Sequence, residues 1–383
     1  MKSGLLFAIS LGLCFMGCAS ANGPHANDVK TAPRSAQFDV ELDWDYALKP
    51  GIPKYLGSVP LEMGSIQNIG PVTYIASSLG KVIAIDNASG RGIWSQDFEM
   101  PITSGPVGDA KSIYIALSSG TIHRLNPRTG ESVWHYETGG AVENGLSVGE
   151  GIVACVNVNN RAFAINAEDG TLLWRRERPR PNEFSMYGQS SPLIENGMVY
   201  LGFSDGYVVA YAAENGTAVW SRELAPDARF KDMDVKPVRD KDALYVAASS
   251  GGLYALSADD GHTLWQRDIY GITSIRVFQN SLYVSSQSGI LRIEKKSGDT
   301  IWQNVIQKEA LISELQLGKT YIYASVQKYG LVMLDRVDGT LRHVIDLGSD
   351  FTTPPQLSPG VLTAMSNNST VYRFIVNDEP IGQ

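Results

Sequence analysis

The sequence predicts an all-β protein, an eight-bladed β-propeller of four-stranded antiparallel blades closed by the N-terminal strand. Three observations predict this fold class. Six tryptophans each close the pattern Gly-x-x-x-Trp, at successive steps of 40, 40, 46, 45 and 37 residues. A period of this size is typical of solenoids, propellers and related arrays. Short apolar runs alternate with glycine turns between the tryptophans, and no stretch shows convincing helical periodicity.

The chain starts with an expected targeting segment, in which Lys2 precedes an apolar run that ends at Gly17. The run is too short to act as a stable transmembrane anchor. A small residue directly before Cys18, after an apolar core, resembles the lipobox of bacterial lipoproteins. This resemblance implies that residues 1–17 are a signal peptide and that Cys18 is lipidated. The alternative is an ordinary signal peptide in which the cysteine stands by chance.

The expected mature chain is acidic. Removing residues 1–17 takes away one lysine and no acid, so 32 basic and 40 acidic residues become 31 and 40, and the formal charge goes from −8 to −9. This balance argues against a nucleic-acid partner, because binding to phosphates needs basic stripes. Residues 18–37 hold almost no large apolar side chain and are expected to form a flexible tether. Cys155 lies in an apolar run and is expected to be buried and unreactive.

The repeats follow in order, and each begins with a strand rich in tyrosine and β-branched residues, such as 198–202. A glycine turn leads to a second strand, such as 207–211, and a second glycine turn precedes the strand that carries the tryptophan. A fourth strand, such as 102–107, leads into the next unit. Each tryptophan is expected to pack between adjacent blades, where its large apolar body contributes most.

The end of the chain predicts how the ring closes. The seventh unit carries His343 at the tryptophan position, and the last unit supplies strands at 351–356, 360–365 and 370–376 but no tryptophan strand. The segment around Trp44 has the character of the missing strand. We therefore expect this N-terminal strand to complete the eighth blade of a propeller that spans residues 38–378, with 379–383 as a C-terminal tail. Seven blades are the alternative.

Two motifs with chemical meaning occur, and neither predicts catalysis. Ser147 lies in Gly-Leu-Ser-Val-Gly, but a nucleophile elbow requires a strand-to-helix turn. Gly318-Lys319-Thr320 lacks the upstream glycine of a phosphate loop and is expected to be a hairpin turn. The histidines do not show metal-ligand spacing; they stand at positions 25, 123, 135, 262 and 343. The sequence therefore predicts no catalytic residue, metal ligand or cofactor.

The blade pattern, with its Tyr-Ala-Leu strand, acid-Gly turn and Leu-Trp strand, resembles the quinoprotein-type (PQQ-like) repeat. Length, lipobox, blade count and N-terminal closure together resemble the BamB family, lipoproteins of the outer-membrane β-barrel assembly machinery. This resemblance implies a non-enzymatic scaffold, lipid-anchored at the periplasmic face of the outer membrane, that assists the folding and insertion of outer-membrane proteins. Ala19 after the lipidated cysteine fits sorting to the outer membrane. The alternative is a quinoprotein-like oxidoreductase or ligand-binding periplasmic propeller.

Two local segments extend the resemblance to candidate site residues. The loop Phe184-Ser-Met186-Tyr187-Gly-Gln-Ser-Ser-Pro is similar to the family's Leu-Ser-Leu-Arg-Gly-Glu-Ser-Ala-Pro, and Asp232-Met-Asp234-Val-Lys-Pro-Val to its Asp-Val-Asp-Thr-Thr-Pro-Val. The resemblance implies that these five residues contact the POTRA domains of BamA, although Tyr187 replaces the family's arginine.

The residues themselves favour an interface in the first loop, because aromatic residues and methionine are enriched at interfaces. The alternatives are packing of this loop onto the neighbouring blade and turn capping by the two aspartates. Unfolded outer-membrane protein strands, added to sheet edges, are a further class of partner.

Overall fold

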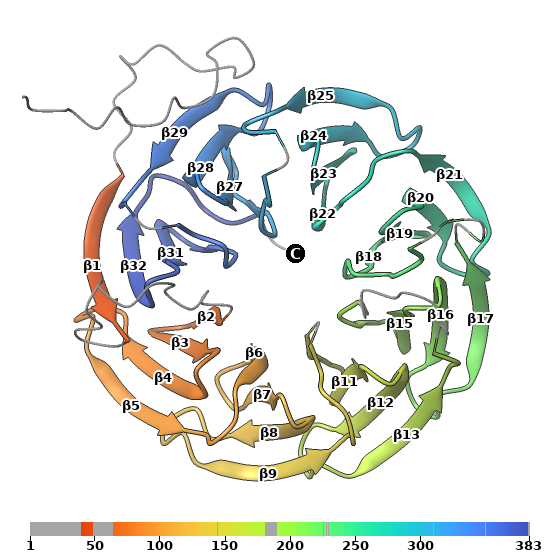
Figure 1. Ribbon diagram of the computed structural model, residues 1–383, viewed down its shortest axis with the longest axis horizontal. Coiled ribbons are helices and arrows are strands. Elements are labelled where there is room, and N and C mark those ends of the chain that lie inside the picture. Colours follow the sequence, from red (N-terminus) through yellow and green to blue (C-terminus); the bar gives the residue numbers. More distant parts are fainter. Residues whose placement is uncertain are drawn as a thin grey trace, which may run out of the picture.

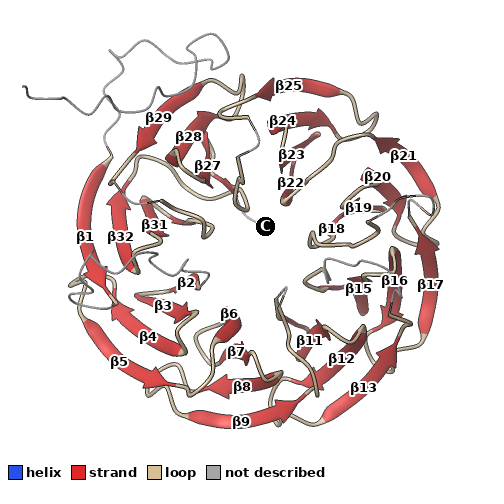
Figure 2. Ribbon diagram, viewed as in Figure 1, coloured by secondary structure: helices blue, strands red, loops and turns tan. Residues whose placement is uncertain are grey.

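The computed structural model describes residues 40–48, 64–143, 145–180, 190–224, 226, 228, 230–308, 310–348 and 350–381. They form eight four-stranded antiparallel sheets, arranged as the blades of a closed ring (Figure 1). The described residues contain strands, turns and loops but no helix (Figure 2), so none of them forms a helix able to cross a membrane. The predicted all-β, eight-bladed propeller is confirmed.

The strands of blades 1 to 4 follow one another along the chain. Blade 1 consists of β2 (Ser65–Ile69), β3 (Val72–Ser77), β4 (Lys81–Asp86) and β5 (Gly92–Asp97). Blade 2 consists of β6 (Ile102–Gly108), β7 (Ile113–Leu117), β8 (Thr121–Leu125) and β9 (Ser132–Glu137). Blade 3 consists of β10 (Ser147–Gly149), β11 (Ile152–Asn157), β12 (Arg161–Asn166) and β13 (Leu172–Glu177). Blade 4 consists of β14 (Leu193–Glu195), β15 (Met198–Gly202), β16 (Tyr207–Ala212) and β17 (Ala218–Glu223).

The second half of the ring repeats this order until the last blade. Blade 5 consists of β18 (Val238–Asp240), β19 (Ala243–Ala248), β20 (Gly252–Ser257) and β21 (Thr263–Arg267). Blade 6 consists of β22 (Ser274–Phe278), β23 (Ser281–Ser286), β24 (Gly289–Glu294) and β25 (Thr300–Asn304). Blade 7 consists of β26 (Gln316–Leu317), β27 (Tyr321–Val326), β28 (Gly330–Asp335) and β29 (Leu341–Ile345). Blade 8 consists of β30 (Gln356–Ser358), β31 (Val361–Met365), β32 (Thr370–Ile375) and β1 (Glu41–Ala47).

In every blade the first strand lies nearest the centre of the ring and the fourth strand, which carries the tryptophan or, in blade 7, His343, lies at the rim (Figure 1). The strand that ends each sequence unit, such as β6, is therefore the innermost strand of the following blade. One strand lies several residues away from its predicted position: the first strand of blade 8 is β30 at Gln356–Ser358, rather than 351–356. Phe351 instead lies fully buried in the core between blades 7 and 8.

The N-terminal strand closes the ring as predicted. β1 pairs antiparallel with β32, which places Trp44 opposite Arg373 and Tyr46 opposite Val371. The carboxylate of Asp43 accepts a hydrogen bond from Nε of Arg373 at 3.0 Å. Without β1, the third strand of blade 8 would be an unpaired sheet edge, which in other proteins favours aggregation.

The apolar core is divided into eight clusters, and each lies between two adjacent blades. Trp174 shows how a tryptophan joins two blades: its ring packs on Gly216 of blade 4, and its Nε1 donates to the carbonyl of Ala213 at 2.8 Å. A β-bulge stands directly before this position in all eight blades. The predicted packing of tryptophan between blades is confirmed. Cys155 is also fully buried, and burial raises the pKa of its thiol to about 12.

Hydroxyl side chains on or next to the innermost strands bond to the segments that lead into the next blade. Thr103 donates to the carbonyl of Val142, and Thr273 donates to that of Ile312. Ser147 belongs to the same set, because its Oγ donates to the carbonyl of Pro192 in the next blade. Its hydroxyl is committed to a structural contact, which agrees with the prediction that this motif is not a nucleophile elbow.

Candidate partner-binding face

The strand order gives the ring two faces of different construction. One face carries the turns between second and third strands and the connections between blades; we call it the connection face. The other carries the turns between first and second and between third and fourth strands; we call it the turn face. The connections 178–192 and 224–237, which enter and leave blade 4, are much longer than the connection 98–101 between blades 1 and 2.

Several acidic groups on the turn face accept hydrogen bonds from their own turns. Asp86 accepts from the backbone N–H and the hydroxyl of Ser89, and these bonds lower the pKa of Asp86. Asp260 likewise accepts hydrogen bonds within its own turn, from Ser257 and His262, and these bonds lower the pKa of Asp260 to about 2. These carboxylates shape the turns that begin the tryptophan strands.

The connection face instead exposes apolar side chains. Five large ones in its turns and connections are between 38% and 57% exposed: Leu79, Met100, Tyr270, Leu311 and Leu347. Val337, 66% exposed, lies on the turn face. Most other exposed apolar residues, such as Ile93 and Val133, are the bulge residues of the rim strands. The connection face is therefore the better candidate for contact with another protein.

Asp232 and Asp234 lie on this face, in the connection before blade 5. Asp232 is 1% exposed, whereas Asp234 is open at the surface and its Oδ2 accepts from the hydroxyl of Ser249 at 2.7 Å. Partial burial and the neighbouring charge of Asp232 raise the pKa of Asp234, and the bond from Ser249 opposes this shift. Of the two acids, Asp234 is the one placed to meet a partner.

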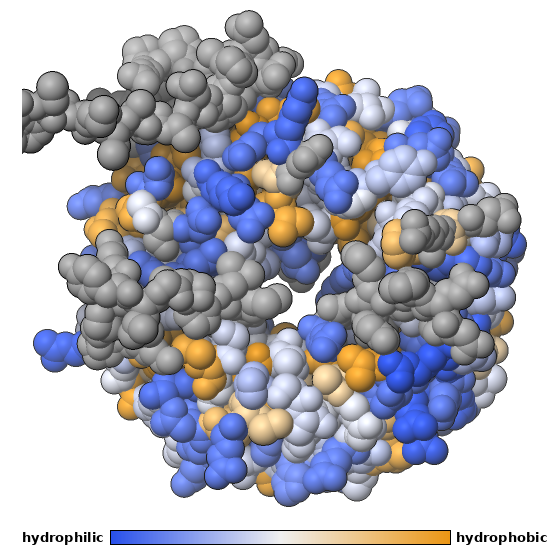
Figure 3. All heavy atoms as spheres, viewed as in Figure 1, coloured by the Kyte–Doolittle hydropathy of each residue, from blue (hydrophilic) through white to orange (hydrophobic). Residues whose placement is uncertain are grey.

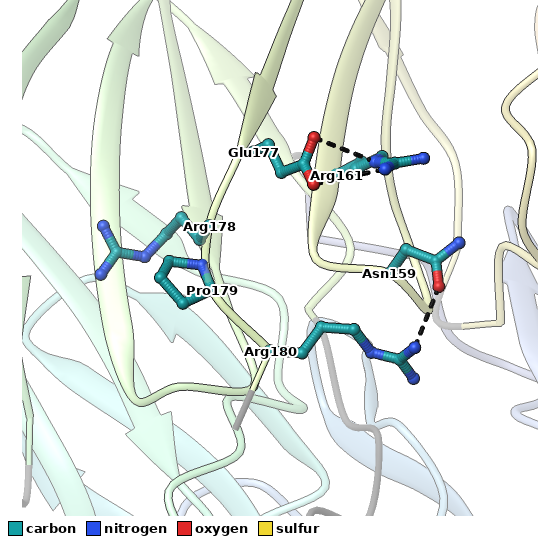
Figure 4. Close-up of a pocket in the computed structure, with 6 residues that line it drawn as sticks. All are labelled: Asn159, Arg161, Glu177, Arg178, Pro179 and Arg180. Carbon is teal, nitrogen blue, oxygen red and sulfur yellow. Dashed lines mark hydrogen bonds and ion pairs between the residues drawn. The ribbon is translucent and has the colours of Figure 1, made fainter. Parts of the chain in front are cut away.

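A pocket of about 540 Å³ lies on the same face at the end of blade 3 (Figure 4). Its lining residues are Asn159, Arg161, Glu177, Arg178, Pro179 and Arg180. Arg161 pairs with Glu177 at 3.1 Å, and Nη1 of Arg180 donates to the amide oxygen of Asn159 at 3.1 Å.

Arg178 points away from these groups toward blade 4, where its Nε lies 2.8 Å from Asp205 and its guanidinium 3.9 Å from the ring centre of Tyr207. Figure 3 shows hydrophilic residues gathered over the rim of blades 3 and 4. Three of the six residues that line the pocket are thus arginines, in a chain that is acidic overall.

Figure 3 shows a central opening in the ring, and β22, the innermost strand of blade 6, carries the charged side chain of Arg276. Arg276 on β22 donates to Glu314 at 2.9 Å and to the carbonyl of Leu315 at 3.1 Å. Burial and the charge of Arg276 lower the pKa of Lys236, and Glu314 opposes that shift. Among the described residues, no group of three or more His, Cys, Asp or Glu could hold a metal ion.

The predicted site residues are only partly placed. Cys18, Phe184, Met186 and Tyr187 lie outside the described residues, so their predicted roles stay predictions. Gly318-Lys319-Thr320 is the predicted turn, and the N–H groups of Thr320 and Tyr321 bind the carboxylate of Asp378.

Sequence reasoning missed the pocket, although the four arginines between residues 175 and 180 were a visible signal. It also missed the role of residues 379–381, assigned above to a tail, which bond to blade 7. They pair with residues 317–319, which lie in the preceding blade and far from them in the sequence, so no local pattern predicts this pairing.

Comparisons with known proteins agree on one family. The family model for the outer membrane protein assembly factor BamB matches residues 78–304. The chain is 24% identical to BamB of Shewanella oneidensis over 91% of this chain and 93% of that one, and 24% identical to BamB of Yersinia pestis over 88% and 89%.

Solved structures share the fold. BamB from Moraxella catarrhalis superposes with a TM-score of 0.74 at 20% identity and covers 88% of this chain and 99% of its own. A quinohemoprotein alcohol dehydrogenase from Comamonas testosteroni superposes with a TM-score of 0.70 at 12% identity, over 90% and 78%. The second likeness concerns the propeller alone, whereas the family model spans more than half of the chain; this protein belongs to the BamB family of outer membrane protein assembly factors.

Proposed function

We propose that this chain is a non-enzymatic scaffold of the outer-membrane β-barrel assembly machinery, which assists folding and insertion of outer-membrane proteins by binding the POTRA domains of BamA. Membership of the BamB family is the observation that carries the proposal. The exposed apolar side chains of the connection face support this face as the site of contact.

In this proposal the long connections on either side of blade 4 make the contact. Phe184, Met186 and Tyr187 supply the apolar part, and Asp234, backed by Asp232, supplies charge. Buried apolar anchors usually dominate the energy of an interface, and truncation of a hot spot costs about 2 kcal/mol or more. Charged residues at the rim mainly change the encounter rate and its dependence on salt.

The test is a pull-down of detergent-solubilised envelope with the tagged full-length chain. Met186→Asp should abolish recovery of BamA, and Asp234→Asn should weaken recovery and reduce its salt dependence. Val337→Asp and Asp259→Asn are matched controls, because both change exposed residues of the turn face. Recovery of no barrel-assembly component, or equal loss in Met186→Asp and Val337→Asp, would refute the proposed site.

Anchoring is proposed separately. Lipidation of Cys18 would hold the chain at the periplasmic face of the outer membrane, because several acyl chains together give stable membrane attachment. Cys18→Ser should release the protein from membranes while leaving the purified propeller able to bind. If parent and variant partition identically and neither carries acyl mass, this part of the proposal fails.

A further inference from the structure

Two histidines on neighbouring strands meet in blade 2. His123 on β8 and His135 on β9 are direct partners in the antiparallel register. Directly paired residues project from the same face of a sheet. Their ring centres are 5.7 Å apart, and the ring of Phe98 lies 5.2 Å from that of His123 on the connection from blade 1. The three rings form a row between blades 1 and 2.

The separation of the two imidazoles fits a shared metal ion. A Zn–N bond is about 2.0–2.1 Å long and a ring centre lies about 1.1 Å beyond its nitrogen, so two rings on a tetrahedral ion have centres about 5.2 Å apart. The observed 5.7 Å differs from this by about half an ångström, which a small side-chain rotation can supply.

Hydrogen bonding fixes which nitrogen of His123 is free to bind. The hydroxyl of Ser132 donates its proton to the carbonyl of Trp134 at 3.3 Å. In the tautomer that can bind a metal ion through Nε2, the oxygen of Ser132 accepts from Nδ1–H of His123, at 2.9 Å. Nε2 of His123 is left with its lone pair. Metal-binding histidines commonly donate their second ring N–H to a fixed acceptor in this way.

We propose that His123 and His135 form a binding site for a borderline divalent transition-metal ion, of the class of Zn²⁺ and Cu²⁺, with water in the remaining positions. Imidazole suits these ions, whereas Mg²⁺ and Ca²⁺ prefer oxygen ligands. Two protein ligands leave open positions, so the bound ion exchanges readily. This site lies in blade 2 and does not depend on the proposed partner contact.

The test is calorimetric titration of the untagged full-length protein in detergent with Zn²⁺, Cu²⁺ and Mg²⁺. We expect one Zn²⁺ or Cu²⁺ per chain, tighter binding of Cu²⁺ than of Zn²⁺, and no binding of Mg²⁺. The electron paramagnetic resonance spectrum of the Cu²⁺ complex should show nitrogen coupling from imidazole. Titrations that show no binding of either transition metal would overturn the proposal.

Variants separate the site from the other histidines. His123→Phe keeps an aromatic ring beside Phe98 but removes the ligand, and it should abolish binding, as should His135→Gln. Ser132→Ala should weaken binding about tenfold, because it removes the bond that orients the ring. His262→Gln is the matched control, since that exposed histidine lies in blade 5. Circular dichroism confirms that each variant is folded. Binding that survives in folded His123→Phe and His135→Gln would place the ion elsewhere and refute the site.

Discussion

Seven of the eight blade interfaces are built around a tryptophan, and the interface between blades 7 and 8 is not. At each of the seven, the indole packs on the glycine that precedes the rim strand of the next blade. The pairs are Trp44–Gly90, Trp94–Gly130, Trp134–Gly170, Trp174–Gly216, Trp220–Gly261, Trp265–Gly298 and Trp302–Gly339. Each glycine has a positive φ, and a Cβ there would lie within 3 Å of the indole ring.

The eighth interface lacks the glycine because the third and fourth strands of blade 8 come from opposite ends of the chain. No turn joins β32 to β1, so a tryptophan at position 343 would have no glycine turn to pack on. His343 stands there instead. The C-terminal segment fills the seam: Asp378 accepts from the N–H groups of Thr320 and Tyr321 and from the hydroxyl of Tyr323, at 3.0 to 3.2 Å.

This difference shows that the repeat loses its tryptophan where the turn that carries the matching glycine is missing. At the interface between blades 7 and 8, the indole ring packed on a glycine is replaced by the buried carboxylate of Asp378, which accepts several hydrogen bonds. Backbone hydrogen bonds from Lys319 to Glu379 and from Ile381 to Leu317 add to these contacts between the C-terminal segment and blade 7. Five predictions test how these two constructions contribute to stability.

Deletion of residues 40–48 should have the largest effect. It removes the rim strand of blade 8 and with it Trp44, which packs in the core shared with blade 1. The exposed edge of β32 should cause aggregation and loss of the cooperative thermal transition. Light scattering and circular dichroism measure both. A monomeric variant that melts like the parent would show that β1 is not needed for closure.

Gly216→Ala should follow in size. The new Cβ would lie 2.6 Å from the ring of Trp174 and would also require a positive φ, so we expect a loss of about 3 kcal/mol or more in unfolding free energy. Gly197→Ala is the matched control, because its φ is +71° but no atom lies within 4 Å of the added Cβ. It should cost only the backbone strain, about 1 kcal/mol. Equal midpoints of urea unfolding for the two variants would contradict the tryptophan–glycine contact.

Asp378→Ala tests the seam. It leaves the N–H groups of Thr320 and Tyr321 and the hydroxyl of Tyr323 without their acceptor, at an expected cost of about 2 to 3 kcal/mol. Glu379→Ala serves as the control, because its ion pair with Lys319 is exposed. The control should melt close to the parent. If Asp378→Ala also melts close to the parent, the bonds of the C-terminal segment do not stabilise the interface between blades 7 and 8.

The regular interfaces could be predicted from the sequence, whereas the interface between blades 7 and 8 could be predicted only in part. The period, the glycine turns and Trp44 predicted the class, the blade count and the closure, because each blade repeats the same local contact. The sequence showed that His343 replaces the tryptophan of the repeat, but it did not show why. Asp378 bonds to residues 55 to 58 positions away, and no local pattern encodes these contacts. His123 and His135 lie in one hairpin, but their register depends on the β-bulge between them and the turn. The loop with Phe184 and Met186 was singled out by its similarity to the family, and its geometry lies outside the described residues.

A smaller effect should distinguish two tryptophans of the regular interfaces. Nε1 of Trp174 donates to Ala213, whereas the buried Nε1 of Trp302 has no hydrogen-bond acceptor among the described residues. Trp174→Phe removes a hydrogen bond and should cost about 1 kcal/mol more than Trp302→Phe, which removes an unsatisfied donor. The two changes delete the same atoms, so the difference in urea midpoints isolates the bond. Identical losses would contradict this account.

The smallest expected effect is the pH dependence of the seam. Burial lowers the pKa of His343 below its ordinary value of 6.5. The unfolded chain therefore binds a proton near pH 6.5 while the folded chain does so only at lower pH, and the unfolding free energy must fall as the pH falls through this window. His343→Gln should reduce the loss of stability between pH 7.5 and pH 5, measured by urea unfolding. His262→Gln, an exposed change in blade 5, should leave the loss unchanged. Because burial lowers the pKa of His123 as well, to about 4, part of the dependence should remain in His343→Gln. A parent whose stability does not fall over this range would show that neither ring is desolvated in the folded protein.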